Sequence, residues 1–581
     1  MTEIDGALRE RVEAWIAQDP DPAARDELTR LLAGAEADEL TDRFRGTLSF
    51  GTAGLRGVVG AGPNRMNRSV VIRATAGLCA WAKMQVPDAR ERGVCIGFDG
   101  RTDSRELAME TAAVVNGAGL RAHVFAQVVP TPVLAFAVLD RNAAAGVMIT
   151  ASHNPPEYNG YKVYWGNGAQ IIPPHDEGIA GCIGTVESAA AVPRVPPPDA
   201  TAQGRLLALG DEVIRRYFDG VRALAVHPEV PKDVGIAYTA LHGVGEPFVR
   251  EALRERGFER VHSVPEQAQP DGRFPTVRFP NPEEDGAMDL VLAVAERNQA
   301  DLVLANDPDA DRLATAVRDS SGAYVMLTGN EIGCMLAHYV LSEGKGERRM
   351  VLSSVVSSPW LGSIAEAHGA HFEQTLTGFK WIANRAIELE RDRGLHFVFG
   401  YEEALGYTVG TLVRDKDGVS AAVTMAEMAA WCRSEGRTLL GERELMWRRY
   451  GMYLSKQVSV VLPGAEGAER ISAIMDAVRR EPPLDLAGRE VSATSDLLTG
   501  RRTRRDGPPE ATGFPPSDVI ILDLLGGHRV RLRPSGTEPK VKFYFDVRVD
   551  VKDTESIDDA RARGQELLDT LAAAFRRRYD A

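Results

Sequence analysis

GVMITASHNPPEYNGYK, residues 146–162, is an apolar run that ends in a group of polar residues. Residues 146–149 predict the end of a buried strand, and residues 154–156 predict a turn because proline cannot donate to a sheet ladder. Ser152 therefore follows the carboxyl end of a strand, where open parallel α/β sheets bind ligands. Its hydroxyl is a candidate nucleophile, and an ordinary polar turn is the alternative.

A second apolar run, DLVLANDPDADR at residues 301–312, ends in three aspartates at alternate positions: Asp307, Asp309 and Asp311. On a tight loop such carboxylates can bind one hard divalent cation. An EF-hand is excluded, because Arg312 and Arg318 stand where that motif requires glycine and glutamate. The remaining alternative is a solvated acidic turn, which mutual repulsion of three carboxylates at a strand end disfavours.

The two runs belong to a threefold internal repeat with copies that begin at Val94, Val234 and Met350. Each copy has the pattern strand, helix, strand, helix, strand. The third copy ends in HFVFGYEEALGY, with Glu402 and Glu403, and a carboxylate can accept hydrogen bonds from two adjacent hydroxyls. Alternating strands and helices predict right-handed crossovers and a mostly parallel sheet in each copy.

Two other motifs carry phosphate-binding residue types. The glycine-rich SFGTAGLRGVVG contains Arg56, which could grip a phosphate in a forked geometry, although such turns are common. RPSGTEPKVKFY supplies charged and small donors suited to a phosphate that is not being transferred. These donors are Arg533, Ser535, Gly536, Thr537 and Lys542.

Through the runs that contain Ser152, the three aspartates and the paired glutamates, together with RPSGTEPKVKFY, the chain resembles the α-D-phosphohexomutase superfamily from about Phe50 to about Tyr544. The resemblance implies three similar α/β domains with mixed, mostly parallel sheets and a smaller C-terminal α+β domain around a central active-site cleft. It also implies that Ser152 carries the phosphoryl group and that Mg²⁺, held by the three aspartates, touches its phosphate. Bisphosphorylated sugar, such as glucose 1,6-bisphosphate, would then be the activator.

The resemblance also implies roles for other side chains. Glu402 and Glu403 would bind sugar hydroxyls, and the loop beginning at Arg533 would bind the distal phosphate. Several residues are candidates for the general acid/base or for further contacts: His153 and Lys162 first, then Lys416, with Lys380 and Arg312 as additional active-site residues. His153 could instead orient the serine, and Lys162 could contact phosphate.

The predicted reaction is the interconversion of sugar 1-phosphate and 6-phosphate (or 5-phosphate), with phosphoglucomutase as the first choice. Hexose-phosphate mutases often carry serine where Ala404 stands, and Phe379 occupies a loop position that varies with sugar preference, so hexose specificity is open. The chain looks most like the phosphoglucomutase/phosphopentomutase subfamily. Phosphopentomutase and phosphomannomutase are therefore the alternatives, followed by glucose-1,6-bisphosphate synthase and a non-catalytic sensor. A serine hydrolase is disfavoured because Thr150 and Asn154 replace the glycines that its nucleophile turn requires.

The whole chain is typical of a soluble enzyme. Its 581 residues predict about four domains. A formal charge of −14 disfavours nucleic acid as a partner, and the sequence contains no candidate membrane span. We expect a cytoplasmic monomer or homodimer that acts on small sugar phosphates.

The pattern predicts five segments: a helical extension at 1–43, then domains at 44–210, 211–325, 326–449 and 450–581. The last of these contains the basic run RRTRRDGPPE, which we interpret as a solvated loop.

Overall fold

The computed structural model describes residues 4–48, 54–462, 464–534 and 540–579. The chain divides into two compact units, which we describe separately. The first comprises residues 1–327 and 406–431, and the second comprises residues 328–405 and 432–581. The five segments expected from the sequence stay a prediction.

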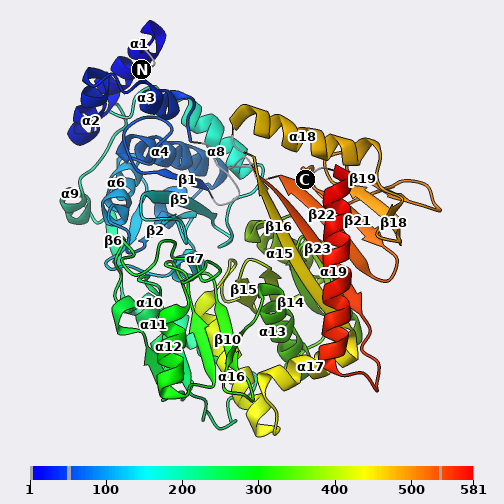
Figure 1. Cartoon of the computed structure of the whole chain (residues 1–581). Helices are drawn as coiled ribbons and strands as arrows, with labels where there is room; N and C mark the ends of the chain where they lie inside the picture. The colour runs from blue at the N-terminus through cyan, green and yellow to red at the C-terminus, as the bar shows by residue number, and fades with distance from the viewer. Residues whose placement is uncertain (1–3, 49–53, 463, 535–539, 580–581) are drawn as a thin grey trace. The chain divides into compact units, whose positions relative to one another are not determined.

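The threefold repeat is confirmed element by element, and Figure 1 labels one helix of each copy, α6, α11 and α15. The first copy consists of β2 (Val94–Phe98), α6 (Ser104–Gly117), β3 (Ala122–Phe125), α7 (Thr131–Asp140) and β4 (Ala145–Ile149). The second consists of β7 (Ile236–Thr239), α11 (Gly245–Glu255), β8 (Val261–Ser263), α12 (Asp289–Asn298) and β9 (Leu302–Ala305). The third consists of β12 (Arg349–Ser354), α14 (Trp360–Ala367), β13 (His371–Thr375), α15 (Phe379–Arg393) and β14 (His396–Glu402).

In every copy the first strand lies between the other two and is parallel to both. The third strands, β4, β9 and β14, therefore end at the same edge of their sheets as the first strands. This topology places the serine, the aspartates and the glutamates at equivalent positions of three related sheets.

Antiparallel strands extend the first two sheets and make them mixed. The first sheet has the order β1-β5-β4-β2-β3-β6, and the second has the order β11-β10-β9-β7-β8. The added antiparallel strands are β1 (Leu55–Val58), β5 (Tyr158–Trp165), β10 (Ala314–Arg318) and β11 (Tyr324–Met326). One further strand of the first sheet, β6 (Leu206–Leu209), is parallel to its neighbour β3. Because β5 returns antiparallel to β4, Lys162 lies opposite Met148 in the buried centre of the sheet.

Helices complete the first unit. The N-terminal helices α1 (Gly6–Gln18), α2 (Pro22–Ala33) and α3 (Ala37–Phe44) share a small apolar core that contains Val12, Leu28 and Leu40. The others are α4 (Arg68–Gln85), α5 (Ala89–Arg92), α8 (His175–Gly184), α9 (Pro197–Ala202), α10 (Asp211–Ala223) and the 3-10 helix η1 (Pro265–Gln267). β15 (Gly406–Val409) and the start of α16 (Gly418–Ser434) also belong to this unit.

The second unit ends in an antiparallel sheet with the strand order β16-β23-β22-β21-β18-β19-β20. The strands are β16 (Met452–Val461), β17 (Asp485–Leu486, paired with β18), β18 (Arg489–Asp496), β19 (Arg501–Arg504), β20 (Glu510–Ala511), β21 (Ile520–Leu524), β22 (His528–Pro534) and β23 (Lys540–Val549). The first residues of the basic run form β19, so our loop interpretation of that run was wrong there. Pairing with β18 and β20 satisfies the β19 backbone.

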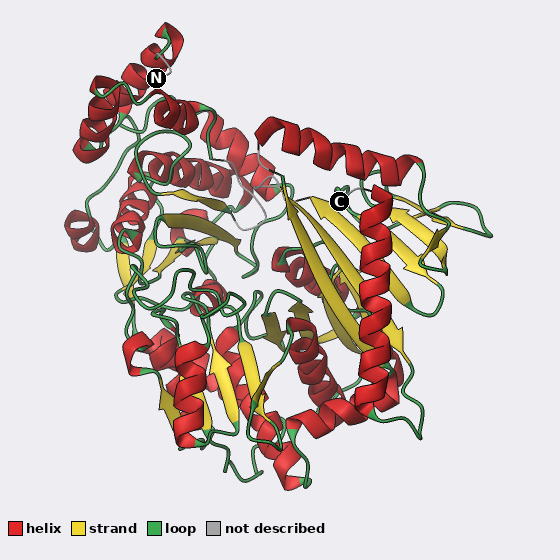
Figure 2. Cartoon of the chain, in the orientation of Figure 1, coloured by secondary structure: helices red, strands yellow, loops and turns green. Residues whose placement is uncertain are grey.

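The second unit also contains α13 (Gly329–Glu343) and α17 (Leu439–Tyr450). Two long helices, α18 (Gly464–Arg480) and α19 (Ile557–Tyr579), lie beside the C-terminal sheet (Figure 2). Met475 of α18 and Phe575 of α19 pack into one core with strand residues such as Leu522 and Phe543. In the described part of the chain, no helix has both the length and the apolar character that a membrane crossing needs.

Candidate active site

Ser152 occupies a constrained position just after β4. Its backbone is left-handed, with φ 53°, and its N–H donates to Thr150 Oγ1 at 2.9 Å. Its hydroxyl donates to Asp307 Oδ2 at 2.6 Å, and His153 Nδ1 lies 3.2 Å from the hydroxyl oxygen. A non-glycine residue in this conformation persists only where its surroundings hold it, so the serine hydroxyl is fixed toward the aspartate loop.

Arg101 holds the serine loop, a function that our sequence analysis missed. Its guanidinium donates to four main-chain carbonyls at 2.5 to 2.9 Å, those of Ser152, Asn154, Pro155 and Tyr158. Neighbouring Asp99 accepts from the hydroxyl of Thr150 at 2.7 Å. The available signal was the pattern FDGR at the end of the first strand of the repeat, which is itself a ligand-binding edge.

The three aspartates converge after β9. Asp307, Asp309 and Asp311 each place a carboxylate oxygen within 4.8 Å of the others, and all three are buried. Ala310 between them has φ 54°, a left-handed turn that brings alternate side chains together. The loop therefore gathers three carboxylates at a buried position.

Two lysines from distant parts of the first unit face these carboxylates. Lys162 Nζ lies 2.7 Å from Asp309 Oδ2 and 2.9 Å from Asp311 Oδ2. Lys416 Nζ lies 3.1 Å from Asp311 Oδ2. Burial of three anions without such partners would be strongly unfavourable, so the lysines stabilise the loop.

The neighbouring charges shift the pKa values of the three aspartates in different directions. Burial, together with Asp309 and Asp311, raises the pKa of Asp307 well above its ordinary value. Burial also opposes ionisation of Asp309 and Asp311, but the pKa of both is lowered, by Lys162 with the Thr131 hydroxyl at Asp309 and by Lys162 with Lys416 and Arg312 at Asp311. The pKa of Lys162 is raised because Asp309 and Asp311 outweigh the effect of its burial. The lysine therefore remains a cation at neutral pH.

The donor set fits a hard divalent cation. Asp309 Oδ1 and Asp311 Oδ1 are buried and have no hydrogen-bond partner within the described ranges. Unsatisfied carboxylate oxygens of this kind are costly unless something binds them. Three convergent carboxylates with no cysteine or histidine among them suit Mg²⁺ better than a softer metal.

Arginines border the same loop. Arg56 on β1 donates from Nη1 to Asn154 Oδ1 at 2.8 Å, while its buried Nε has no partner among the described residues. Burial and the nearby Arg312 lower the pKa of Arg56 to about 10, so it stays charged. Arg312 donates its N–H to Asp307 Oδ1 at 3.0 Å. Burial, with Arg312 and Arg56, lowers the pKa of His153 well below its ordinary value, which leaves a neutral imidazole.

The loop that carries Lys416 is anchored by its two flanking aspartates. Asp415 Oδ2 accepts from Tyr164 at 2.6 Å and from Gln170 at 2.8 Å, and Asp417 Oδ1 accepts from Tyr217 at 2.8 Å. These buried contacts fix the backbone on both sides of Lys416. Its ammonium group is thereby directed toward Asp311.

In the second unit, a backbone N–H and two serine hydroxyls donate to the glutamates, and the guanidinium of Arg531 is near enough to Glu403 to interact with its charge. Glu402 accepts from the N–H of Gly378 at 2.7 Å, and Gly378 has φ 112°, which favours glycine. Glu403 accepts from the hydroxyls of Ser354 at 3.1 Å and Ser357 at 3.3 Å. The buried Lys380 is the second residue of α15, two residues after Gly378.

The predicted phosphate loop is described only at its two ends. Arg533 on β22 lies directly opposite Lys542 on β23, and like charges at such positions repel unless an anion lies near them. Ser535, Gly536 and Thr537 lie outside the described residues. Arg531, which our sequence analysis missed, donates to the carbonyls of Val355 and Ser357 at 3.1 and 2.7 Å. Its position two residues before Arg533 on a strand was the available signal.

Family models identify the class of protein. The models described as phosphoglucomutase/phosphomannomutase, alpha/beta/alpha domains I, II and III match residues 47–190, 215–322 and 328–450. The chain therefore belongs to the phosphoglucomutase/phosphomannomutase family of the α-D-phosphohexomutase superfamily, which confirms the resemblance seen in the four motifs. It is a phospho-sugar mutase, an isomerase of carbohydrate metabolism.

Relatives that match almost the whole chain carry several names. The chain is 39% identical to a "Probable phosphoribomutase" of Schizosaccharomyces pombe and 36% identical to a "Phosphopentomutase" of Homo sapiens. These matches cover 94% of this chain and 94% and 92% of those proteins. It is 40% identical to a "Probable phosphomannomutase" of Haemophilus influenzae, over 85% of this chain and 95% of that one. The crystal structure of a putative phosphomannomutase from Thermus thermophilus has a similar fold, with TM-score 0.68 and 21% identity, over 92% of this chain and 100% of that one.

Proposed function

We propose that this mutase acts on pentose phosphates, moving a phosphoryl group between O1 and O5 of ribose or deoxyribose. The observation that carries the proposal is the similarity to a probable phosphoribomutase and a phosphopentomutase along nearly the full length of each. Our first choice from the sequence was glucose phosphate, and these relatives favour the pentose alternative. Ala404 supports it, because it lacks the hydroxyl that hexose-phosphate mutases often carry after the paired glutamates.

A hexose phosphate is the second candidate substrate. It is favoured by the similarity to a probable phosphomannomutase, which matches a smaller share of this chain. Both candidates use the same chemistry, so the residues discussed below serve either substrate.

We assign the phosphoryl carrier to Ser152. In the first step, the phosphorus–oxygen bond of phosphorylated Ser152 breaks, phosphorus bonds to a sugar hydroxyl oxygen, and the hydroxyl proton ends on Ser152 Oγ. After the bisphosphorylated sugar reorients, its other phosphoryl group returns to Oγ and the proton returns to the sugar oxygen. Trace glucose 1,6-bisphosphate would start the cycle by phosphorylating the free serine.

His153 is the best supported acceptor and donor for that proton. Its Nδ1 lies 3.2 Å from Ser152 Oγ, and its imidazole is neutral because its pKa is lowered. Lys162 is held as a cation by two carboxylates and would serve as an acid or a charge partner rather than a base. Lys416 contacts Asp311 in the same manner.

Asp307, Asp309 and Asp311 would hold Mg²⁺, with the phosphate on Ser152 as a further ligand. When bound, Mg²⁺ neutralises charge that develops on the transferring phosphoryl group. Arg56 and Arg312 add positive charge beside the serine loop, and Arg101 fixes the loop backbone so that Oγ keeps its direction.

The remaining residues would bind the parts of the substrate that do not react. Glu402 and Glu403 would accept hydrogen bonds from sugar hydroxyls, with Lys380 as a further contact. Arg533 and Lys542, with Ser535, Gly536 and Thr537, would bind the distal phosphate. A cytoplasmic location and a monomeric or homodimeric state stay predictions from the sequence.

The test is initial-rate activity with Mg²⁺ and trace glucose 1,6-bisphosphate on the 1-phosphates of ribose, deoxyribose, glucose and mannose. We expect the highest kcat/KM on the pentose phosphates and no turnover by Ser152→Ala on any of them. A higher kcat/KM on glucose or mannose 1-phosphate would refute the pentose assignment. Full activity of Ser152→Ala would refute the phosphoserine mechanism, and net accumulation of sugar bisphosphate would indicate a synthase.

A further inference from the structure

Arg531 connects the C-terminal sheet to the turn that follows β12, residues 354–358, which we call the β12 turn. The arginine lies in the middle of β22, and its Nη1 donates to the carbonyls of Val355 and Ser357 at 3.1 and 2.7 Å. Both ends of this contact belong to the second unit. A guanidinium nitrogen that holds two carbonyls of one short turn fixes where that turn lies on the sheet.

The β12 turn also holds Glu403. The hydroxyl of Ser357 accepts from the N–H of Glu403 at 3.1 Å and donates to its Oε2 at 3.3 Å. The hydroxyl of Ser354 donates to the same carboxylate oxygen at 3.1 Å. The backbone and the side chain of Glu403 are thus both bound to the turn, so a displacement of the turn would displace the carboxylate.

A second chain of contacts ties the far end of the β12 turn to the same sheet. Asn330 of α13 accepts from the N–H of Ser358 at 2.8 Å and donates to the hydroxyl of Ser455 on β16 at 3.2 Å. Ser455 donates to Asp546 Oδ1 on β23 at 2.5 Å, and Asp546 pairs with Arg531. The contacts therefore begin and end at Arg531, and three neighbouring strands hold the turn.

This junction is buried. Arg531 and Asp546 are both buried, and Val355 packs in one apolar cluster with Ile521 of β21. Burial lowers the pKa of Arg531 to about 9 and the nearby Glu403 opposes the shift, so the guanidinium stays charged at neutral pH. A charged group buried in this way is costly unless its contacts are kept, which favours one fixed arrangement of the turn.

The strand that carries Arg531 also carries Arg533. Side chains two residues apart on a strand lie on the same face of the sheet, so Arg533 lies on the face that meets the β12 turn. Tyr544 of β23 lies opposite Arg531. Burial and Glu403 raise the pKa of Tyr544, whereas Arg533 lowers it. Glu403 and Arg533 are therefore both near this tyrosine.

We propose that Arg531 is a positioning residue, which fixes Glu403 relative to Arg533 through the β12 turn. Within the proposed function, on which this assignment rests, Glu403 binds sugar hydroxyls and Arg533 binds the distal phosphate. Arg531 then sets the spacing between these two sites. A sugar phosphate occupies both sites at once and depends on their spacing, whereas free phosphate does not.

The first test is Arg531→Lys. Lysine keeps a cation beside Asp546, but its single nitrogen cannot replace Nη1 at the carbonyls and the second guanidinium nitrogen at Asp546. On the sugar 1-phosphate that the chain converts fastest, we expect kcat/KM to fall about tenfold, as in Glu403→Gln. The double variant Arg531→Lys/Glu403→Gln should also lose about tenfold and not a hundredfold, because both changes act through one carboxylate. The inhibition constant of inorganic phosphate should not change.

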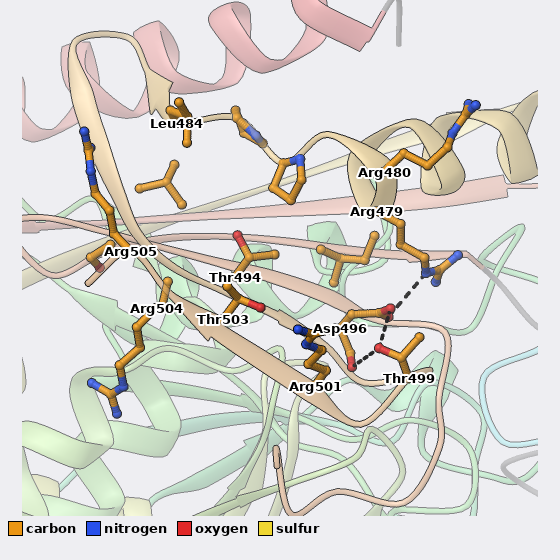
Figure 3. A pocket seen from close by; sticks show the side chains of 16 residues that line it. Arg479, Arg480, Leu484, Thr494, Asp496, Thr499, Arg501, Thr503, Arg504 and Arg505 are labelled. Carbon is orange, nitrogen blue, oxygen red and sulfur yellow. Dashed lines mark hydrogen bonds and ion pairs between the residues drawn. The ribbon is translucent and has the colours of Figure 1, made fainter. Parts of the chain in front are cut away.

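Ser357→Ala removes the last link to Glu403 without changing any charge. It should lower kcat/KM several-fold and add little to the loss in Glu403→Gln. Arg479→Lys is the matched control, because Arg479 is a partly buried arginine of the same unit that pairs with Asp496 at 3.2 Å. It lines a hollow of the C-terminal sheet that contains no residue of the β12 turn (Figure 3). Its kcat/KM should stay within about twofold of the unaltered chain.

The outcomes separate the positioning role from the proposed function. The positioning role is overturned, and the proposed function stands, if Arg531→Lys leaves kcat/KM unchanged, if its loss multiplies with that of Glu403→Gln, or if it weakens inhibition by phosphate as much as it lowers kcat/KM. If Glu403→Gln alone leaves kcat/KM unchanged, Glu403 does not bind the sugar, and both assignments fail.

Discussion

Two equivalent strand ends of the repeat carry carboxylates that different groups hold in place. After β9, Asp307, Asp309 and Asp311 are buried and face the ammonium groups of Lys162 and Lys416. At the end of β14, Glu402 and Glu403 accept from a backbone N–H and from serine hydroxyls.

The difference shows that neighbouring elements decide the chemistry of a strand end. Cations allow three carboxylates to approach closely, which creates an arrangement suited to a divalent metal. The N–H of Gly378 and the serine hydroxyls orient the two glutamates, and a carboxylate held in this way can accept further hydrogen bonds from hydroxyls.

Asp309→Asn should lower kcat by about a thousandfold or more, because it removes one charged ligand from the proposed metal site. Mg²⁺ binding, measured by calorimetry, should weaken in parallel. Asp285→Asn, which changes an exposed aspartate of the same domain, is the control. Unchanged Mg²⁺ affinity in Asp309→Asn would contradict the assignment of this loop as the metal site.

Lys162→Met should destabilise the metal-free protein by about 3 to 5 kcal/mol, because it leaves buried carboxylates without their cation. Mg²⁺ should restore much of this loss, since a bound cation stabilises only the folded state. Urea unfolding with EDTA and with Mg²⁺ measures both quantities, and exposed Lys83→Met is the control. An equal loss under both conditions would show that Lys162 does not compensate the charge of the metal loop.

Glu403→Gln should lower kcat/KM by about tenfold, because a neutral amide accepts more weakly from a sugar hydroxyl. The Mg²⁺ concentration that gives half-maximal rate should not change, and neither should the stability with EDTA. Steady-state kinetics at varied Mg²⁺ and urea unfolding with EDTA check these two expectations. A changed Mg²⁺ requirement would break the separation between the two acidic strand ends.

Ala404→Ser should raise the kcat/KM ratio of glucose 1-phosphate to ribose 1-phosphate by about three- to tenfold, because it adds a hydroxyl beside the two glutamates that we propose bind the sugar. Parallel assays of both substrates, with Phe379→Tyr as a second variant of the same region, measure the ratio. If the ratio stays the same in both variants, residues other than Ala404 and Phe379 decide the specificity for the sugar.

Much of this protein could be predicted from local patterns. The alternation of apolar strands and helices predicted the threefold repeat, because periodicity and turn residues are local properties. The polar residues after β4 and β9 predicted where Ser152 and the aspartates lie, since the carboxyl ends of such strands bind ligands. Charge repulsion among Asp307, Asp309 and Asp311 predicted a metal site rather than a solvated turn.

Only the tertiary structure showed which side chains meet. Lys162 and Asp309 are 147 residues apart, and Ser152 and Asp307 are 155 apart. The role of Arg101 depends on carbonyls more than 50 residues away, and β19 is a strand because β18 and β20 pair with it. The sequence by itself thus determined the repeat and the residues at its strand ends, while the folded chain decided their partners. The physical reason is that strand and turn preferences act over a few residues, whereas buried ion pairs and sheet pairing depend on contacts that form only when distant segments pack together.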